Sequence, residues 1–349
     1  MNFSSVRHRL PQSPTAIQDE FEKRGWSDGL PIIPPTEALV REMLAGTPLP
    51  PQHEVARLEP THRIATVEKI AINAVMAGCR PVHLPVVIAA INAVSDPAFC
   101  QLPMGTNPAT PLAVVSGPAR QLLQINCSYN TLGTGTGANL KIGRAIRLVI
   151  QNVGLGGALS VHDQTTIGMP GKLGMCIGEN EEASPWEPLH VERGWGRESN
   201  TVTVFNVTGT LNIVDMESKD AVALLTTIGR SMVAHGINNF IYPTMPLVIL
   251  GPEHASLLAA ASYSKADVKA ALWKFARIPE DEFSPGLRDY LNNRSARSVK
   301  AIDGYVHVTE AAEGIAVIVA GGLGPHSAFL PTLGFNRNDA QTREILLPK

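Results

Sequence analysis

The sequence predicts an α/β fold of two similar β-α-β-α-β halves, which form mostly parallel sheet(s) with helices on the faces. Short apolar runs of strand length alternate with longer segments of helical period, and several runs end on glycine. Four dipeptides of the first half also recur in the same order in the second, with equal Gly-Pro to Ser-Tyr intervals: Pro-Leu at 111 and 246, Gly-Pro at 117 and 251, Leu-Leu at 122 and 257, and Ser-Tyr at 128 and 262. The alternative is a coincidence between two ordinary strand-to-helix turns.

The chain of 349 residues divides into an N-terminal helical arm (1–52), a first α/β half (53–200) and a second α/β half (201–349). In the arm, helices are predicted over 15–25 and from the N-cap Thr36 to residue 45. In the two halves, strands are predicted at 55–58, 112–115, 175–177, 201–207, 247–250 and 315–320. Helices are predicted after Thr66 and Ser218, and at 85–94, 119–123, 139–151, 253–261 and 265–276.

Composition excludes several classes of protein. Charged residues make up 17% of the chain and the net charge is −2, so no basic surface for nucleic acid is expected. The longest apolar stretches hold about a dozen residues, too few for a membrane span. The polar, irregular stretch 1–14 does not have the pattern of a signal segment, and none is expected. The four cysteines show no C-x-x-C spacing, which favours reduced thiols. We expect a cytoplasmic homo- or hetero-oligomer with no membrane contact.

The most informative stretch is 174–195, where a short apolar run ends at Gly178 and charged residues follow. These are Glu179, Glu181, Glu182, Glu187, His190, Glu192 and Arg193, with Pro185 and Pro188 between them. Prolines and charges at this density continue neither a strand nor an ordinary helix. Such a concentration at one strand end predicts a functional site.

This acidic cluster has three interpretations. Glu179 and Glu182 with His190 could bind a divalent metal through oxygen and imidazole ligands. One carboxylate with a raised pKa could instead act as general acid or base. The third interpretation is a solvated acidic loop that pairs with Arg193 and Arg197. Because no metal-ligand spacing such as H-x-x-x-H is present, acid–base chemistry is the favoured functional interpretation.

Other titratable residues follow predicted strands, where α/β sheets bind ligands. Among them, His254 and His326 are candidate catalytic residues, and His62, Arg63 and Ser327 are candidate substrate-binding residues. His326 and Ser327 are adjacent, so their side chains diverge and do not form a nucleophile–base pair by themselves. A structural role is the alternative for each lone histidine.

Glycine-rich turns are candidates for binding an anion through backbone N–H groups. They are the turn at Gly117, the loop 131–144 with Gly135 and Lys141, and the loop 321–327 with Gly322. The alternative is a flexible connection. None of them matches a P-loop or a dinucleotide fingerprint, so the cofactor is unknown and a divalent metal stays open.

Cys79 is a candidate nucleophile. It follows the helix-ending Gly78 and precedes Arg80-Pro81 and a predicted helix N-terminus. A nearby guanidinium and a helix N-terminus both favour the thiolate. A buried, inert cysteine is the alternative.

Three stretches resemble a poorly characterised family of bacterial proteins that is associated with small proteins bearing a UGSC motif (selenocysteine or cysteine). They are 27–36, Ala77-Gly78-Cys79-Arg80-Pro81, and 179–186 (ENEEASPW). The resemblance spans most of the chain but implies no activity and no residue roles. Since the chain has no Cys-Gly-Ser-Cys run, the resemblance implies a UGSC-type partner that supplies the motif.

Together these features predict an enzyme that acts on a small anionic, carboxylate-bearing substrate by acid–base chemistry. A lyase, hydratase or hydrolase fits better than a dehydrogenase, with Cys79 as an optional nucleophile. The alternatives are a subunit whose thiol- or selenol-bearing partner completes the site, and a metal-dependent hydrolase.

Overall fold

The computed structural model describes residues 3–99, 106–135, 137–294, 299–334 and 339–348. Its longer α-helices are α1 (Pro14–Lys23), α2 (Glu37–Leu44), α3 (Val67–Met76), α4 (Leu84–Val94), α6 (Gly137–Val149), α8 (Ala221–Ser231), α9 (Pro252–Ala260) and α10 (Lys265–Phe275). The shorter ones are α5 (Ala119–Leu122), α7 (Leu189–Glu192) and α11 (Pro285–Asp289).

Eight strands form two four-stranded sheets. The first sheet has the order β12 (Gln341–Glu344), β5 (Thr201–Val207), β3 (Thr110–Ser116), β4 (Met175–Gly178). The second has the order β10 (Ala316–Val319), β7 (Leu247–Leu250), β11 (His326–Leu330), β6 (Leu211–Val214). Two two-stranded sheets complete the strands: the hairpin of β1 (Glu54–Leu58) with β2 (Arg63–Thr66), and the pair of β8 (Arg277–Pro279) with β9 (Tyr305–His307).

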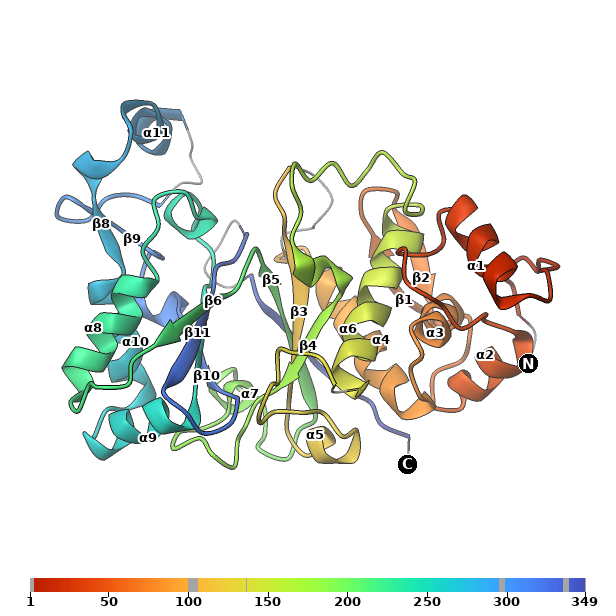
Figure 1. Ribbon diagram of the computed structural model, residues 1–349, viewed down its shortest axis with the longest axis horizontal. Coiled ribbons are helices and arrows are strands. Elements are labelled where there is room, and N and C mark those ends of the chain that lie inside the picture. Colours follow the sequence, from red (N-terminus) through yellow and green to blue (C-terminus); the bar gives the residue numbers. More distant parts are fainter. Residues whose placement is uncertain (1–2, 100–105, 136, 295–298, 335–338, 349) are drawn as a thin grey trace.

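The sheets and helices form four layers along the long axis of the molecule, with helices outside and the two sheets inside (Figure 1). Side chains alternate across each strand, as strand geometry requires. On β3, Ala113 and Val115 join the core beneath α3, α4 and α6, whereas Leu112 and Val114 meet residues of the second sheet. Helices α8 and α10 cover the far face of the second sheet. Each sheet therefore has helices on one face and the other sheet on its other face.

The α/β class is confirmed, but the prediction of mostly parallel strands is wrong for the described residues. Only β3–β4 and β7–β10 pair in parallel, and the other pairs of these sheets are antiparallel. The prediction assumed a helical crossover between successive strands. Instead, β6 follows β5 after a short turn, and β11 follows β10 after a glycine-rich turn.

The edge strands are exchanged between the sheets. β6 follows β5 in the chain but pairs with β11 in the second sheet, whereas β12 returns to pair with β5 in the first. The predicted boundary at residue 200 therefore does not separate two self-contained halves. The N-terminal arm does form helices, and Phe21, Val40 and Met43 bury it against the first half.

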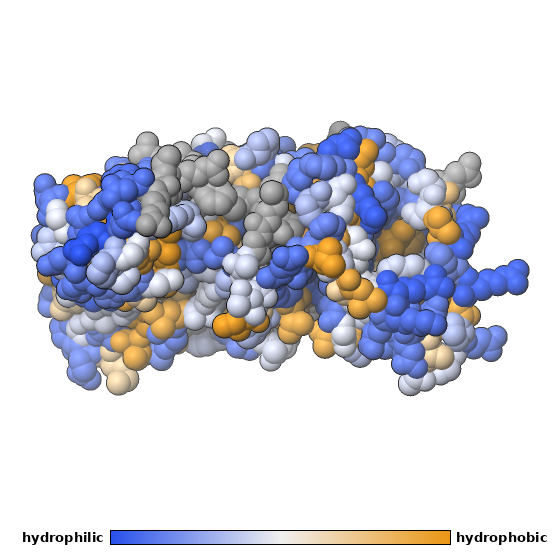
Figure 2. Space-filling model, turned by 90° about the horizontal axis from the view of Figure 1, so that it is seen from above, coloured by the Kyte–Doolittle hydropathy of each residue, from blue (hydrophilic) through white to orange (hydrophobic). Residues whose placement is uncertain are grey.

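Local signals placed most helix starts correctly. Thr36 and Thr66 cap α2 and α3 by accepting hydrogen bonds from Leu39 N and Lys69 N. Ser218 does not cap α8, because Asp215 binds its N–H and hydroxyl groups, and Asp220 takes the cap position. No helix in the described ranges is long and apolar enough to cross a membrane. Figure 2 shows polar residues over most of one face, with smaller hydrophobic areas between them.

The layer between the sheets should carry much of the stability. Phe205 lies in this layer and is 1% exposed, so Phe205→Ala should lower the free energy of unfolding by about 3–5 kcal/mol. Leu211→Ala on β6, where the side chain is 45% exposed, should change it by less than about 0.5 kcal/mol. Urea unfolding followed by circular dichroism measures both, and equal effects would contradict face-to-face packing of the sheets.

Candidate functional site

The parallel pairing of β3 with β4 brings two chain segments together at the carboxyl ends of both strands. Val115 pairs with Gly178, so Ser116 and Gly117 lie opposite the start of the acidic stretch. The N–H of Glu179 donates to the carbonyl of Val115 at 3.1 Å and extends the ladder by one residue. The first acidic side chain is thereby fixed at the end of a buried sheet.

Glu179 is fully buried and is held by three hydrogen bonds. Ser116 Oγ donates to its Oε2 at 3.0 Å, and the N–H of Leu189 donates to both carboxylate oxygens, at 2.9 and 3.1 Å. Burial raises the pKa of this carboxyl to about 7, although these hydrogen bonds and Lys265 act in the opposite direction. Glu179 thus carries a proton that is easily gained and lost near neutrality.

Glu181 lies on the same side of the chain, two residues further on. Its Oε1 accepts a hydrogen bond from Gly117 N at 2.6 Å and forms an ion pair with Arg120, whose Nε lies 3.0 Å away. Gly117 has a φ of 86°, and a Cβ there would lie 2.1 Å from the carbonyl oxygen of Ser199. Only glycine fits this turn, so the Gly117 N–H is aimed at Glu181 by a local requirement of the backbone.

His190 is fully buried on the short helix α7, and its Nε2 lies 3.1 Å from the carbonyl oxygen of Arg197. A carbonyl oxygen only accepts, so Nε2 carries the hydrogen, and Nδ1 of the neutral ring is an acceptor. This Nδ1 is buried and has no hydrogen-bond partner among the residues that the structure describes. Buried polar atoms are seldom left in this state, so the Nδ1 lone pair requires an explanation.

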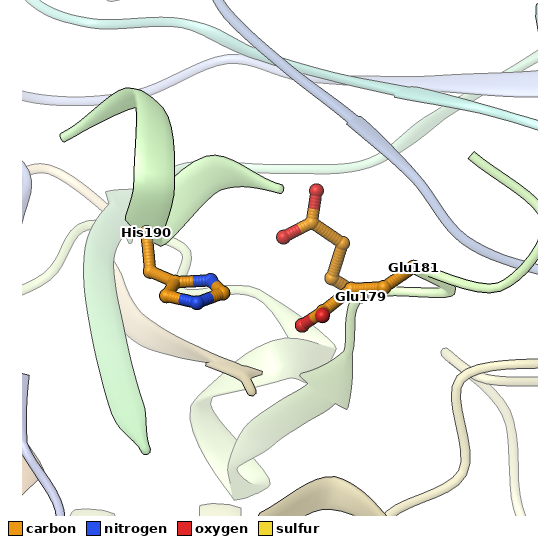
Figure 3. A group of neighbouring side chains, drawn as sticks. All are labelled: Glu179, Glu181 and His190. Carbon is orange, nitrogen blue, oxygen red and sulfur yellow. The ribbon is translucent and has the colours of Figure 1, made fainter. Parts of the chain in front are cut away.

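Glu179, Glu181 and His190 form one cluster. One ligand atom from each lies within 4.8 Å of the others, and Figure 3 shows both carboxylates on the same side of the His190 ring. Glu181 is the most exposed member, with 13% of its side chain accessible. Among the described residues this is the one such group of three with spacing that suits a metal ion.

Arg120 is the cation in direct contact with this cluster. Its guanidinium also pairs with Glu182 at 2.9 and 3.0 Å, and it donates to the carbonyl oxygen of Glu179 at 2.7 Å. The Arg120 hydrogen bonds hold the pKa of Glu182 at about 2. Glu182 is half-exposed and pairs with Arg120, and the group of three contains Glu181 at the place predicted for Glu182.

Cys79 does not have the predicted reactive thiolate. Its side chain packs against the first core, and its Sγ donates to the carbonyl of Lys141 at 3.4 Å. Burial raises the pKa of the thiol to about 12, and the charges of Lys141 and Arg144 do not offset this effect. These contacts favour the alternative of an inert cysteine, whose side chain is half-buried.

The predicted grouping of Glu179 with His254 or His326 is not found. His254 is buried in a separate group, where its Nδ1 lies 2.8 Å from Ser327 Oγ and its Nε2 lies 3.1 Å from the carbonyl of Asp215. His326 is exposed at the start of β11. The prediction assumed one continuous sheet, whereas these residues belong to the second sheet and Glu179 follows a strand of the first.

His62 and Arg63 are exposed on the β1–β2 hairpin, where His62 lies 3.0 Å from Glu59 Oε1. In Figure 1 this hairpin lies beside the N-terminal helices, well separated from α7. The structure therefore does not bring these two residues to the Glu179 cluster.

The predicted anion-binding glycine loops differ in the contacts that they make. The N–H of Gly117 binds Glu181, so the turn belongs to the cluster but holds one of its own carboxylates. Gly322 packs against Tyr129, because a Cβ there would lie 2.0 Å from the ring. Gly135 lies in open space with a φ of 91°, and Lys141 belongs to the surroundings of Cys79. None of these contacts indicates an anion.

The sequence interpretation missed Glu181 and Arg120. Alternation along an extended chain was the available signal for Glu181, since residues 179 and 181 point to the same side. Arg120 follows the Gly-Pro turn by two residues, a spacing that carries no recognisable pattern.

In the metal-free protein, the raised pKa of Glu179 should make stability depend on pH. The folded carboxyl has a pKa of about 7 against an ordinary 4.5, so the folded state binds more protons between these values. The free energy of unfolding should therefore fall as the pH rises through this window, and should level off above it. The fall is about 3 kcal/mol at most, since one pH unit is worth 1.36 kcal/mol.

Urea unfolding at several pH values, in the presence of a chelator, measures this slope. Glu179→Gln should remove the part of the pH slope that Glu179 contributes. Asp339, whose pKa burial also raises to about 7, remains in both proteins, so their difference reports on Glu179. An unchanged slope in the variant would show that Glu179 is ionised at acidic pH.

Comparisons with protein-family models and with curated protein sequences found no match to this chain.

Proposed function

We propose that this chain is a metal-dependent enzyme of the hydrolase or lyase type, in which Glu179, Glu181 and His190 hold one divalent cation. Its substrate would be a small carboxylate-bearing molecule. The observation that carries the proposal is the unpartnered Nδ1 of His190, buried beside two carboxylates. Two carboxylate oxygens and one imidazole nitrogen suit ions such as Mn²⁺ or Zn²⁺.

The groups around the cluster support this proposal. A histidine that binds a metal through one nitrogen usually donates its other N–H to a carbonyl or carboxylate, as His190 does to Arg197. Ser116 and Leu189 orient Glu179, while Gly117 and Arg120 orient Glu181. All three candidate ligands are thus held in place by groups of the chain itself.

The balance of charges in the cluster also supports a bound cation. With Glu179 ionised, the carboxylates of Glu179, Glu181 and Glu182 carry three negative charges, and Arg120, which pairs with the last two, supplies one positive charge in direct contact. Buried charge of one sign is costly, and a divalent cation would compensate it. The same imbalance and the same burial favour protonation of Glu179 when no cation is bound.

A divalent ion at this position would act as a Lewis acid that polarises a carbonyl oxygen of the substrate. Glu181, with 13% of its side chain accessible, is the candidate ligand that solvent reaches. Arg120, fixed by two carboxylates and two carbonyl groups, would keep Glu181 in place while charge develops in the substrate.

Acid–base catalysis without a metal is the second candidate. The pKa of Glu179, about 7, favours it, because a general acid or base works best when its pKa is near the working pH. Glu179 would then exchange a proton with the substrate or with Nδ1 of His190. The two candidates differ in one measurable property, the affinity for divalent ions.

The proposal that a UGSC-type partner completes the site rests on the sequence resemblance alone. The cysteines that the structure describes are Cys79, Cys127 and Cys176, all free thiols. Burial raises the pKa of each of them, so a reactive thiol or selenol would have to come from elsewhere.

We also infer that the two sheets descend from one repeated unit. Both have a parallel pair next to antiparallel strands in the same order, with β3, β4 and β5 corresponding to β7, β10 and β11. Gly117-Pro118 and Gly251-Pro252 both join a strand to the following helix. Arg120 and His254 occupy equivalent positions, three residues after these glycines, so the unit would have diverged in chemistry.

Metal binding is the first test of the proposed function. Metal-free protein titrated with Mn²⁺ or Zn²⁺ in a calorimeter should bind one ion per chain. His190→Gln and Glu181→Gln should each weaken binding at least tenfold, because each removes a ligand. Circular dichroism checks that both variants stay folded.

Glu187→Gln is the matched control, since Glu187 lies on the same segment but is exposed. It should bind the ion as the unmodified protein does. If the protein binds no divalent ion, or if the control loses affinity as much as the ligand variants, the metal proposal fails and acid–base catalysis remains.

The partner proposal predicts that a small UGSC-bearing protein co-purifies with the tagged chain from its native host. Mass spectrometry of the purified complex identifies it. A chain that purifies alone and turns over substrate without addition would contradict this proposal.

A further inference from the structure

A cavity of about 710 Å³ lies between the acidic segment of the first half and α10 of the second. Glu192 and Arg193 line it from one side, and Lys265 and Lys269 line it from the other. Part of the wall is apolar and is formed by Leu189, Met245, Ile315 and Ala316. Its size is within the range of small-molecule sites, and residues from distant parts of the sequence build it.

The inner wall carries excess positive charge. Lys265 and Lys269 are both buried, and the two share a single carboxylate, Glu192. Arg193 donates to Thr342 Oγ1 at 2.7 Å and to the carbonyl of Ala340 at 2.6 Å, which are neutral acceptors. Within the described ranges it has no ion pair with a carboxylate. Together these three cations thus contact one carboxylate, Glu192. The buried carboxyls of Glu179 and Asp339 also interact with Lys265 and Arg193, respectively, but burial raises the pKa of each to about 7.

The remaining charged groups of the cavity are at its mouth. Glu187, Asp267 and Glu313 are exposed to solvent, and Asp267 is also occupied in capping α10 through Ser264. Water and salt screen exposed charges strongly, whereas charges in a partly enclosed wall act at short range with less screening. An anion that enters would therefore meet mainly the inner cations.

The cavity adjoins the Glu179 cluster through one residue. Leu189 lines the cavity, and its backbone N–H donates to both oxygens of Glu179. A ligand held against Arg193 and Lys269 would lie next to the segment that carries Glu179 and His190.

We propose that this cavity binds a small dicarboxylate, with one carboxylate at Arg193 and the other at Lys265 and Lys269. Arginine suits the first position because its planar fork binds both oxygens of a carboxylate. The apolar wall would contact the hydrocarbon between the two carboxylates. This inference names the substrate class of the proposed enzyme. The claim that the anion is a substrate rests on the proposed function, whereas the claim that the anion binds does not.

Titration of the metal-free protein with succinate, measured by calorimetry, tests the binding. Lys269→Gln and Arg193→Gln should each weaken succinate binding at least tenfold. Lys274→Gln is the matched control, because it removes the same charge from an exposed position of the same helix. It should leave the affinity within twofold. Arg193 also anchors the C-terminal segment, so Lys269→Gln keeps the test valid if the arginine variant unfolds.

Two further ligands test whether the cavity selects dicarboxylates. The neutral diamide succinamide should not bind, and inorganic phosphate should bind more weakly than succinate. Binding of succinamide as tight as that of succinate, phosphate binding that exceeds it, or full affinity in Lys269→Gln would each overturn the proposal. His190→Gln should lose the metal but keep succinate, so failure of the metal site and failure of the anion site are distinguishable.

Discussion

Packing of the two sheets against each other is the constraint on which the rest of the structure depends. Helices cover the outer face of each sheet and the other sheet covers its inner face, so the seven residues of β3 are all buried. Charged side chains are disfavoured along strands that are buried on both faces, and they occur where the strands end. Glu179 is the first residue after β4, and its burial follows directly from this position.

Arg120 links the elements that meet at these strand ends. One guanidinium holds Glu181 and Glu182 and also binds the carbonyl groups of Gly117 and Glu179. It therefore joins the turn after β3 to the segment after β4. Its position also gives the two acidic neighbours different roles, because Glu182 turns out toward solvent while Glu181 turns in toward His190.

Sequence periodicity predicted the buried strands and missed those of mixed polarity. The alternating run of β5 and the continuous apolar run of β7 were placed at their observed bounds, because both patterns are typical of buried strands. The strands β6, β11 and β12 carry polar residues such as Asn212, Ser327 and Arg343, and they were not predicted. Their partners come from distant parts of the chain, which local patterns do not encode.

The sequence predicted where the candidate site lies but not all of its residues, because contacts between distant parts of the chain decide which side chains meet there. The density of charge after residue 178 located it, and Glu179 and His190 both belong to it. The choice of Glu181 over Glu182 depends on Arg120, which is about sixty residues away in sequence. The state of Cys79 likewise depends on the packing of α6 around it, and the neighbouring Arg80 does not decide it.

The exchange of edge strands bears on how the chain is synthesised. β5 leaves the ribosome early, but its partner β12 lies within the last ten residues of the chain. Until those residues emerge, one edge of the first sheet presents unpaired backbone N–H and C=O groups, which can pair with other chains. Completion of the first sheet must therefore wait until β12 has been translated, and the nascent chain would depend on protection of that edge in the meantime.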